Sequence, residues 1–264
     1  MATVLLFGAE GICGRAILDA LIKDPTFAHI YVAPPFSHPH HKRKIQFVPL
    51  NFEDDQSTMV QNLDQVPKID YIFYCAYRQG AGPSEVRRLN IKLMINFLVA
   101  LNTFNHLRDL KRFILTQDFW KYGPYMGRMK QPCEETDPSV CDDLEGVSWP
   151  PSYHDVQQKL VKEAAARGGW EWVITYAHNV LGHAPNNFPN PALALGIYAA
   201  TSKAMPGSEL PFPGNMESYR NFNTWVSSRH LAKFCLWAAT AAGAGEPGVQ
   251  CHQRRRRTFS DLVA

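Results

Sequence analysis

The sequence lacks several features that would assign it to a large class of proteins. None of its apolar runs is long enough to cross a bilayer, although 45% of its 264 residues are hydrophobic. The first residues enter an apolar run directly, so we expect no leader of basic and then apolar residues. The cysteines never stand in C-x-x-C spacing, which argues against a zinc site and favours a reducing compartment. We therefore predict a soluble, cytoplasmic protein with no membrane partner.

Excess charge is also absent from most of the chain. The formal net charge is +3, and the four arginines at 254–257 together with Asp261 account for all of it. A neutral body gives no reason to expect a nucleic-acid partner. A chain of this length can bury a large core, so we expect one main domain with a smaller appendage.

The first strand and the turn after it are the most informative stretch. Residues 3–7 form a short apolar run, typical of a parallel strand that is buried on both faces. Gly8, Gly11 and Gly14 follow in G-x-x-G-x-x-G spacing, ahead of an amphipathic helix predicted over 15–23. Gly8 permits the tight turn, Gly11 lets a diphosphate approach the helix N-terminus, and Gly14 lets the helix pack on the strand. This order predicts a dinucleotide-binding fold with Ile12 in the cofactor site; the alternative is a turn that keeps the fold without holding a nucleotide.

The loop after the second predicted strand, residues 29–33, decides which dinucleotide fits. An acidic residue there would bind the ribose hydroxyls of NAD, and an arginine would bind the 2′-phosphate of NADP. Pro34 and Pro35 stand there instead, and the basic residues Lys42, Arg43 and Lys44 come later. We expect NADP(H), bound weakly, in preference to NAD(H). A solvated loop is the competing interpretation, and we expect no metal at the histidines within 38–41.

Strands and helices alternate through most of the chain. We expect further strands over 46–50, 69–77, 111–117 and 172–176, and helices over 57–63, 84–105 and 153–167. This alternation predicts an α/β fold, a doubly wound parallel sheet of the Rossmann type with helices on both faces. Residues 1–183 would form the Rossmann domain. Residues 184–264, with helices over 192–205 and 228–241 and a strand near 222–226, would form a small, partly interleaved substrate lobe.

Ligands of this fold lie at the carboxyl ends of the parallel strands. The residues that follow those ends are our candidates for the cofactor groove: Asn51, Ala76, Tyr77, Gln117, Asn179 and Val180. Residues 118–150 form a long loop beside the expected nicotinamide position, and a loop of this length is usually functional or mobile.

The catalytic group is harder to identify. Short-chain dehydrogenases use a tyrosine as proton donor or acceptor and a lysine that lowers its pKa, in Tyr-x-x-x-Lys spacing. Tyr153 is the candidate here, but Gln157 stands where the lysine would be. The residues alone therefore do not indicate a standard dehydrogenase.

The chain nevertheless resembles one branch of that superfamily from its N-terminus to about residue 249. The most specific stretches are 72–74 (IFY), 115–117 (LTQ) with 122–123 (YG), 132–138 (PCEETDP) and 179–185 (NVLGHAP). There it is similar to the progesterone 5β-reductase/iridoid synthase-like (PRISE) enzymes of the atypical extended short-chain dehydrogenase/reductase type, particularly fungal members. The resemblance implies NADPH-dependent reduction of enones, with a lysine from the loop after the fifth strand and a tyrosine from the start of the next helix.

Three positions depart from the family pattern. When the chain is aligned with the family pattern at Tyr122, Trp120 stands at the position of the family's lysine, and Lys121 stands one residue after it. Prolines replace the family's arginine pair after the second strand, and Tyr176 and Ala177 replace its Arg-Pro after the sixth. Family members also have substantially more sequence beyond this point, so we interpret residues 251–264 as a truncated or mispredicted end. Tyr153 and Lys121 are our catalytic candidates.

Three functions stay open. The first is an NADPH-dependent reductase of a small enone or carbonyl compound in secondary metabolism, in which Tyr153 stabilises or protonates the enolate. The second is a non-redox cyclase or isomerase that uses the groove to orient a reactive substrate. The third is a non-catalytic binding protein or decayed paralogue. The partner in each case is a small molecule, and a homodimer is left open.

Overall fold

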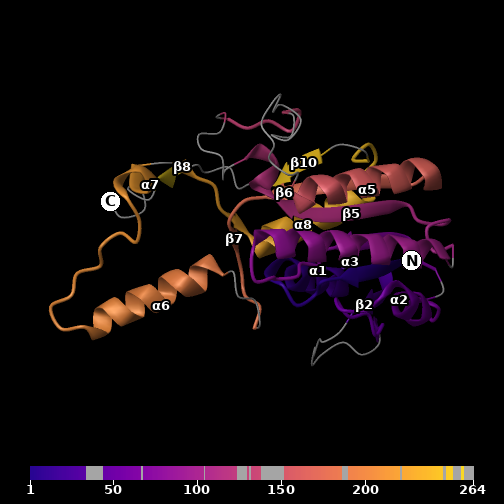
Figure 1. Cartoon of the computed structure of the whole chain (residues 1–264), viewed down its shortest axis with the longest axis horizontal. Helices are drawn as coiled ribbons and strands as arrows, with labels where there is room; N and C mark the ends of the chain where they lie inside the picture. Colours follow the sequence, from indigo (N-terminus) through magenta and orange to yellow (C-terminus); the bar gives the residue numbers. More distant parts are fainter. Residues whose placement is uncertain are drawn as a thin grey trace.

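The computed structural model describes residues 1–33, 44–66, 68–103, 105–123, 130, 132–137, 152–185, 190–220, 222–245, 248–251 and 257–258. Its centre is a seven-stranded sheet in the order β10-β6-β5-β4-β1-β2-β3, and every pairing in it is parallel (Figure 1). The strands are β1 (Ala2–Phe7), β2 (Phe27–Val32), β3 (Ile45–Phe47), β4 (Tyr71–Tyr74), β5 (Arg112–Asp118), β6 (Glu171–Ala177) and β10 (Gly248–Cys251). The strand order reverses between β1 and β4, and ligands of this fold bind beside the carboxyl ends at such a point.

Strand β1 lies in the middle of the sheet, as its apolar sequence predicts. It pairs with β2 on one side and with β4 on the other, so that Leu5 stands opposite both Tyr31 and Ile72. Five of its six residues are buried. A strand that is flanked by two others and covered on both faces exposes almost no side chain to solvent. This is why the run is apolar throughout.

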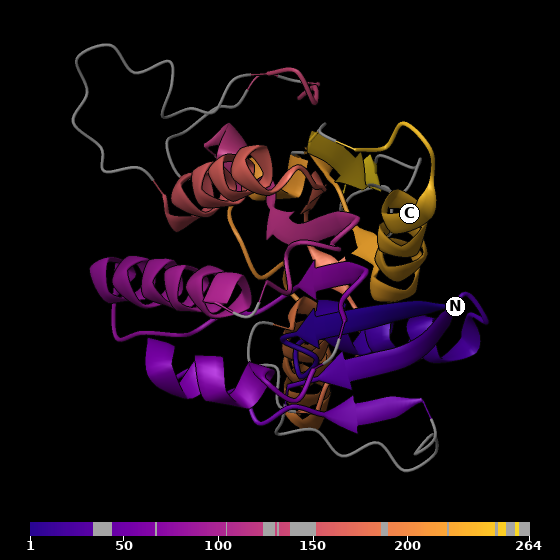
Figure 2. The same cartoon turned by 90° about the vertical axis from the view of Figure 1, so that its right-hand side faces the viewer.

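Helices cover both faces of the sheet, and the prediction of a doubly wound fold is confirmed (Figure 2). On one face lie α2 (Gln56–Leu63), α3 (Pro83–Thr103) and α5 (Tyr153–Gly168), over a core that includes Phe7, Tyr74 and Phe97. On the other face lie α1 (Ile12–Lys23) and α8 (Ser228–Thr240), which bury Ile17 and Leu231 together.

Short segments lie beyond the carboxyl edge of the sheet. They are η1 (Phe119–Tyr122), β7 (Val180–Leu181), α6 (Pro191–Ala204), α7 (Met216–Arg220), β8 (Phe222–Asn223), β9 (Val226–Ser227) and β11 (Arg257–Thr258). Strand β7 pairs with β9, and β8 pairs with β11. One strand is predicted near 222–226, and the structure has two short strands there, β8 and β9, which pair with different partners. Strand β10, which extends the main sheet beside β6, has no counterpart among the predicted elements.

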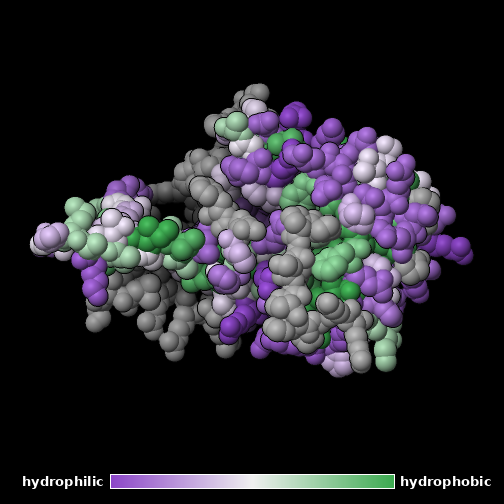
Figure 3. All heavy atoms as spheres, turned by 90° about the horizontal axis from the view of Figure 1, so that it is seen from below, coloured by the Kyte–Doolittle hydropathy of each residue, from purple (hydrophilic) through white to green (hydrophobic). Residues whose placement is uncertain are grey.

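Helix α6 stands away from the body of the molecule (Figure 1). It leaves the apolar side chains of Leu193 and Ile197 more than half exposed, and Figure 3 shows hydrophobic atoms on this projecting segment. None of the described helices has the length and apolar content to span a membrane. The division into residues 1–183 and 184–264 stays a prediction, although α8 and β10 from the second range pack on the sheet of the first.

Candidate functional site

The glycine turn after β1 is held by close backbone contacts that only glycine allows. Gly8 has φ +94°, and a Cβ there would lie 2.5 Å from the backbone nitrogen of Ala76. A Cβ on Gly14 would lie 2.1 Å from the carbonyl oxygen of Gly8. Gly11 is the N-cap of α1 and has extended backbone. The turn thus places bare backbone at a helix N-terminus, an arrangement that favours a phosphate group.

The other end of the expected cofactor groove differs from the prediction. Lys44 donates from Nζ to the carbonyls of Ile22 and Asp24, at 3.1 and 3.0 Å. It therefore binds the C-terminal end of α1, at the amino edge of the sheet, and does not reach the adenosine end of the groove. Lys42 and Arg43 lie outside the described residues, as do the two prolines after β2. Asn51 is exposed after β3, and its backbone N–H donates to Asp54 Oδ2 at 2.8 Å.

Two tyrosines meet at the carboxyl edge beside the turn. Ala76 is buried and Tyr77 is 40% exposed, just past the end of β4. The ring centroids of Tyr77 and Tyr153 are 6.2 Å apart. The Tyr77 hydroxyl donates to Gln79 Oε1 at 2.8 Å. The structure therefore brings together one predicted groove residue and the predicted proton donor.

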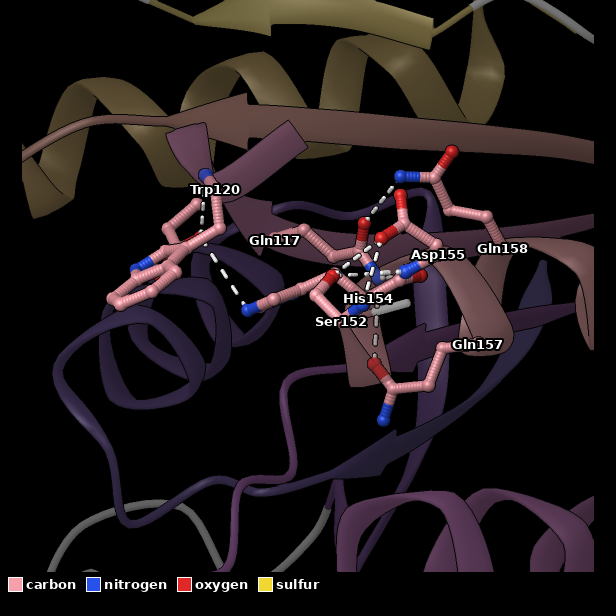
Figure 4. A network of polar contacts seen from close by, with 8 residues as sticks. Gln117, Trp120, Ser152, His154, Asp155, Gln157 and Gln158 are labelled. Carbon is pink, nitrogen blue, oxygen red and sulfur yellow. Dashed lines mark hydrogen bonds and ion pairs between the residues drawn. The ribbon is translucent and has the colours of Figure 1, made fainter. Parts of the chain in front are cut away.

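Tyr153 is the first residue of α5, and a capping box fixes the start of that helix. The Ser152 hydroxyl accepts from the backbone N–H of Asp155, and the Asp155 carboxylate accepts from the backbone N–H of Ser152 (Figure 4). Burial and the nearby Asp118 carboxylate raise the pKa of Tyr153 well above its usual range. The phenol therefore stays protonated at neutral pH, which suits a hydrogen-bond or proton donor and not a base.

Lys121 is directed elsewhere. Its Nζ donates to the carbonyl of Glu135 at 3.0 Å and lies 5.0 Å from the ring centroid of Tyr176. Trp120, which stands at the family's lysine position, is 45% exposed. Through these two contacts Lys121 connects residues 132–137 with the end of the sheet. Its role in catalysis stays a prediction.

A buried chain of amides holds the first turn of α5 against the sheet, and Figure 4 shows its three glutamines together. Gln117 donates from Nε2 to the His154 carbonyl at 3.0 Å and to Gln157 Oε1 at 3.3 Å. Gln158 donates to Gln117 Oε1 at 2.8 Å and accepts from the Tyr176 hydroxyl at 3.1 Å. Gln157 therefore stands at the expected lysine position as a hydrogen-bonded amide, and Gln117 holds the first turn of α5, which begins with Tyr153. A contact of Gln117 with the cofactor stays a prediction.

Asp118 and His154 form a pair that sequence reasoning missed. His154 Nε2 lies 3.4 Å from Asp118 Oδ1, which also accepts from the backbone N–H of Trp120 at 2.9 Å. The His154 side chain is 7% exposed and the Asp118 side chain 44% exposed. His178 stacks on Phe119 next to them, with ring centroids 5.2 Å apart. The one available signal in the sequence was a carboxylate at the carboxyl end of β5.

Burial moves the pKa values of this pair in opposite directions. It raises the pKa of Asp118, and it lowers the pKa of His154 and of His178 below the usual value for histidine. Each shift disfavours the charged form of its group. The neutral forms of Asp118, His154 and His178 are therefore favoured over what isolated side chains would show.

The residues after β6 pack next to the glycine turn. Asn179 donates from Nδ2 to the Thr224 carbonyl at 3.5 Å, and Val180 pairs with Val226. A Cβ on Gly182 would lie 2.5 Å from Cγ2 of Ile12, so β7 passes close to the start of α1. Within the described part of the chain, no group of three histidine, cysteine, aspartate or glutamate side chains is placed to hold a metal ion.

Comparison with known proteins places the chain among extended short-chain dehydrogenase/reductase proteins. The model of the NAD dependent epimerase/dehydratase family matches residues 4–250. The uncharacterized protein C757.02c of Schizosaccharomyces pombe is 25% identical over 245 residues, which are 92% of this chain and 59% of that protein. (S)-8-oxocitronellyl enol synthase CYC2 of Camptotheca acuminata is 22% identical over 258 residues, 95% of this chain and 64% of that protein. The chain thus spans less than two thirds of the length of these relatives.

Solved structures agree on the fold. The UDP-glucose 4-epimerase of Brucella ovis, in complex with NAD, superposes with a TM-score of 0.71 at 15% identity. The match covers all of this chain and 81% of the epimerase.

Proposed function

The chain belongs to the NAD dependent epimerase/dehydratase family, and we propose that within it the protein is an NADPH-dependent reductase of a small enone or carbonyl compound. The single observation that carries this proposal is Tyr153: a protonated phenol at the start of α5, beside Tyr77 at the carboxyl edge where the glycine turn also lies. The similarity to an enol synthase and the PRISE-like stretches support the same chemistry.

The described residues fit a dinucleotide. Gly8 and Gly14 leave a cradle that a Cβ would fill, at the N-terminus of α1. When bound, NADPH would supply a hydride to the substrate. Tyr153 would donate a hydrogen bond, and then its proton, to the substrate's carbonyl oxygen as negative charge develops there. Gln117 and the capping box at Ser152 hold the helix start that carries the phenol.

Turnover of a panel of small enones, followed by the loss of reduced-nicotinamide absorbance, tests the proposal. Tyr153→Phe should lower kcat by about a hundredfold or more, the scale of losing one oxyanion donor. Tyr71→Phe is the matched control, because Tyr71 begins β4 at the opposite edge of the sheet. Lys121→Ala should have little effect, and Trp120→Lys should raise activity. Equal turnover in Tyr153→Phe and Tyr71→Phe would remove Tyr153 from the mechanism.

Cofactor preference is tested separately by calorimetric titration. We expect NADP(H) to bind weakly, yet more tightly than NAD(H), since a missing charge-assisted phosphate contact weakens binding by roughly ten- to a hundredfold. Tighter binding of NAD(H) would contradict this preference.

A non-redox isomerase or cyclase is the second candidate. The Asp118–His154 pair beside Tyr153 favours it, because a carboxylate and an imidazole are suited to moving a proton within a substrate. Conversion of a carbonyl substrate without consumption of NADPH would identify this activity.

A further inference from the structure

The charge beside Tyr153 differs from what a lysine would provide. Burial raises the pKa of the Tyr153 phenol, and the negative charge of the Asp118 carboxylate raises it further. Lys121 lies at the Glu135 carbonyl. A negative charge next to the position where a substrate oxygen becomes an oxyanion opposes the reaction.

We propose that Asp118 and His154 hold one proton between them while negative charge develops on the substrate oxygen at Tyr153, so that the pair is neutral at that moment and replaces the missing lysine. This inference rests on the proposed function. Three contacts carry it: the 3.4 Å approach of His154 Nε2 to Asp118 Oδ1, the 3.9 Å separation of the Tyr153 and His154 ring centroids, and the fixed orientation of Asp118 by the Trp120 N–H.

The environment of His154 makes its protonated form depend on Asp118. Its Nδ1 is buried and has no hydrogen-bond partner in the described chain. Its side chain is 93% buried, so the charged form needs the Asp118 carboxylate as its partner. Asp118 is the more exposed member of the pair, which gives protons from solvent a route to it.

Among the described residues, four other titratable groups interact with the pair. Asp155 on α5 acts on His154, and His178 after β6 acts on Asp118. Tyr77 after β4 and Tyr153 itself also feel the Asp118 charge. Because Asp118 and His154 interact, the proton belongs to the pair, and its loss should appear as one apparent titration on the acid side of neutral pH.

Removing Asp118 and removing His154 should leave the site with different net charges. Asp118→Asn leaves a neutral site at every pH near neutrality. His154→Gln leaves the carboxylate unpaired, and the site then stays negative through the neutral range. The double variant should behave like Asp118→Asn. If the two side chains had only a structural role, both single variants would weaken the site and the double variant would be the weakest.

The first measurement is an NMR titration of the imidazole in protein with labelled histidine, assigned with His154→Gln. The His154 midpoint should fall by about one pH unit in Asp118→Asn, a tenfold loss of proton affinity on removing the partner charge. Glu163→Gln, which removes one negative charge near the far end of α5, is the matched control and should leave the midpoint unchanged. An unchanged midpoint in Asp118→Asn would overturn the proposal.

The second measurement uses 2,4-dinitrophenolate, an oxyanion that stays ionised across neutral pH, as a probe. Its affinity for the wild-type protein should rise about tenfold as the pH falls through the His154 midpoint. Affinity should be high and independent of pH in Asp118→Asn and in the double variant, and low throughout the neutral range in His154→Gln. Weak binding in the double variant would overturn the proposal.

Turnover of an enone should follow the same pattern, with kcat rising toward acid pH in the wild type and pH-independent in Asp118→Asn. The two failures are distinguishable. Absence of turnover with every enone would refute the proposed function, while the NMR and probe titrations would still decide whether the pair holds the proton.

Discussion

Replacing Gly14 by alanine tests the glycine turn directly. In most helices this change stabilises by about 1 kcal/mol, because alanine loses less backbone freedom on folding. At Gly14 the new Cβ would stand 2.1 Å from the Gly8 carbonyl oxygen, whereas real Cβ atoms essentially never approach within 3.0 Å. The clash is with backbone, so α1 and the turn must separate. Overpacking of this kind costs about 1–3 kcal/mol.

We take the upper end of that range, because no flexible side chain can move aside. After the gain in helix propensity, the net loss should be about 2 kcal/mol. At about 2–4 °C for each kcal/mol, the melting temperature should fall by roughly 4–8 °C. The displaced Gly8 carbonyl belongs to the proposed diphosphate site, so NADPH affinity should also drop, by about tenfold or more.

Gly196→Ala is the matched control. It is the same chemical change inside another helix, α6, where a Cβ would meet nothing within 4 Å. Its melting temperature and NADPH affinity should equal or exceed those of the wild type. Differential scanning calorimetry and calorimetric titration measure both quantities. If Gly14→Ala were as stable as Gly196→Ala, the close contact between turn and helix would not exist in solution.

Three further predictions concern charged or titrating groups outside the site. Arg112→Met should lower the free energy of unfolding, measured by urea denaturation, by about 3 kcal/mol. The reason is that Arg112 is buried between Glu171 and two carbonyls at the end of α8. Lys111→Met, at an exposed neighbour, is the control and should lower it by less than 1 kcal/mol. Lys44→Ala should weaken folding by about 1 kcal/mol without changing the preference for NADP(H), and a shift toward NAD(H) would place its amine at the phosphate after all. Burial lowers the pKa of His106 in the folded state, so the unfolded chain binds the proton at a higher pH than the folded chain does. Stability should therefore fall as the pH drops below about 6.5. Urea midpoints at two pH values measure this fall in stability, and His106→Gln should make it smaller.

Much of the fold could be predicted because each element depends on local chemistry. The apolar run of β1 and the spacing of Gly8 and Gly14 are properties of adjacent residues, and the structure confirms the doubly wound sheet that they predict. The missed elements are of another kind. Strands β7, β8, β9 and β11 have two residues each, too few to show a period, and they pair outside the main sheet.

The site was less accessible to sequence reasoning because its contacts join distant parts of the chain. Gln157 looked only like a missing lysine, and its hydrogen bond with Gln117 shows that the position is a structural amide. Spacing could not show whether Lys121, one residue after the family's lysine position, reaches the site. The direction of its side chain depends on the residue at which the 3-10 helix η1 begins. Likewise, Asp118 and His154 become a pair only when α5 packs beside β5.

The pairing of α1 with α8 has a consequence for synthesis of the chain. One face of the sheet is closed by these two helices, which come from opposite ends of the sequence, so the core on this face stays incomplete until Leu231 and Cys235 have been added. At about 5–20 residues per second, a ribosome needs roughly 10–50 s to reach them. Throughout that interval the nascent chain displays an apolar surface, and a chaperone that binds such surfaces has time to engage it before the domain closes.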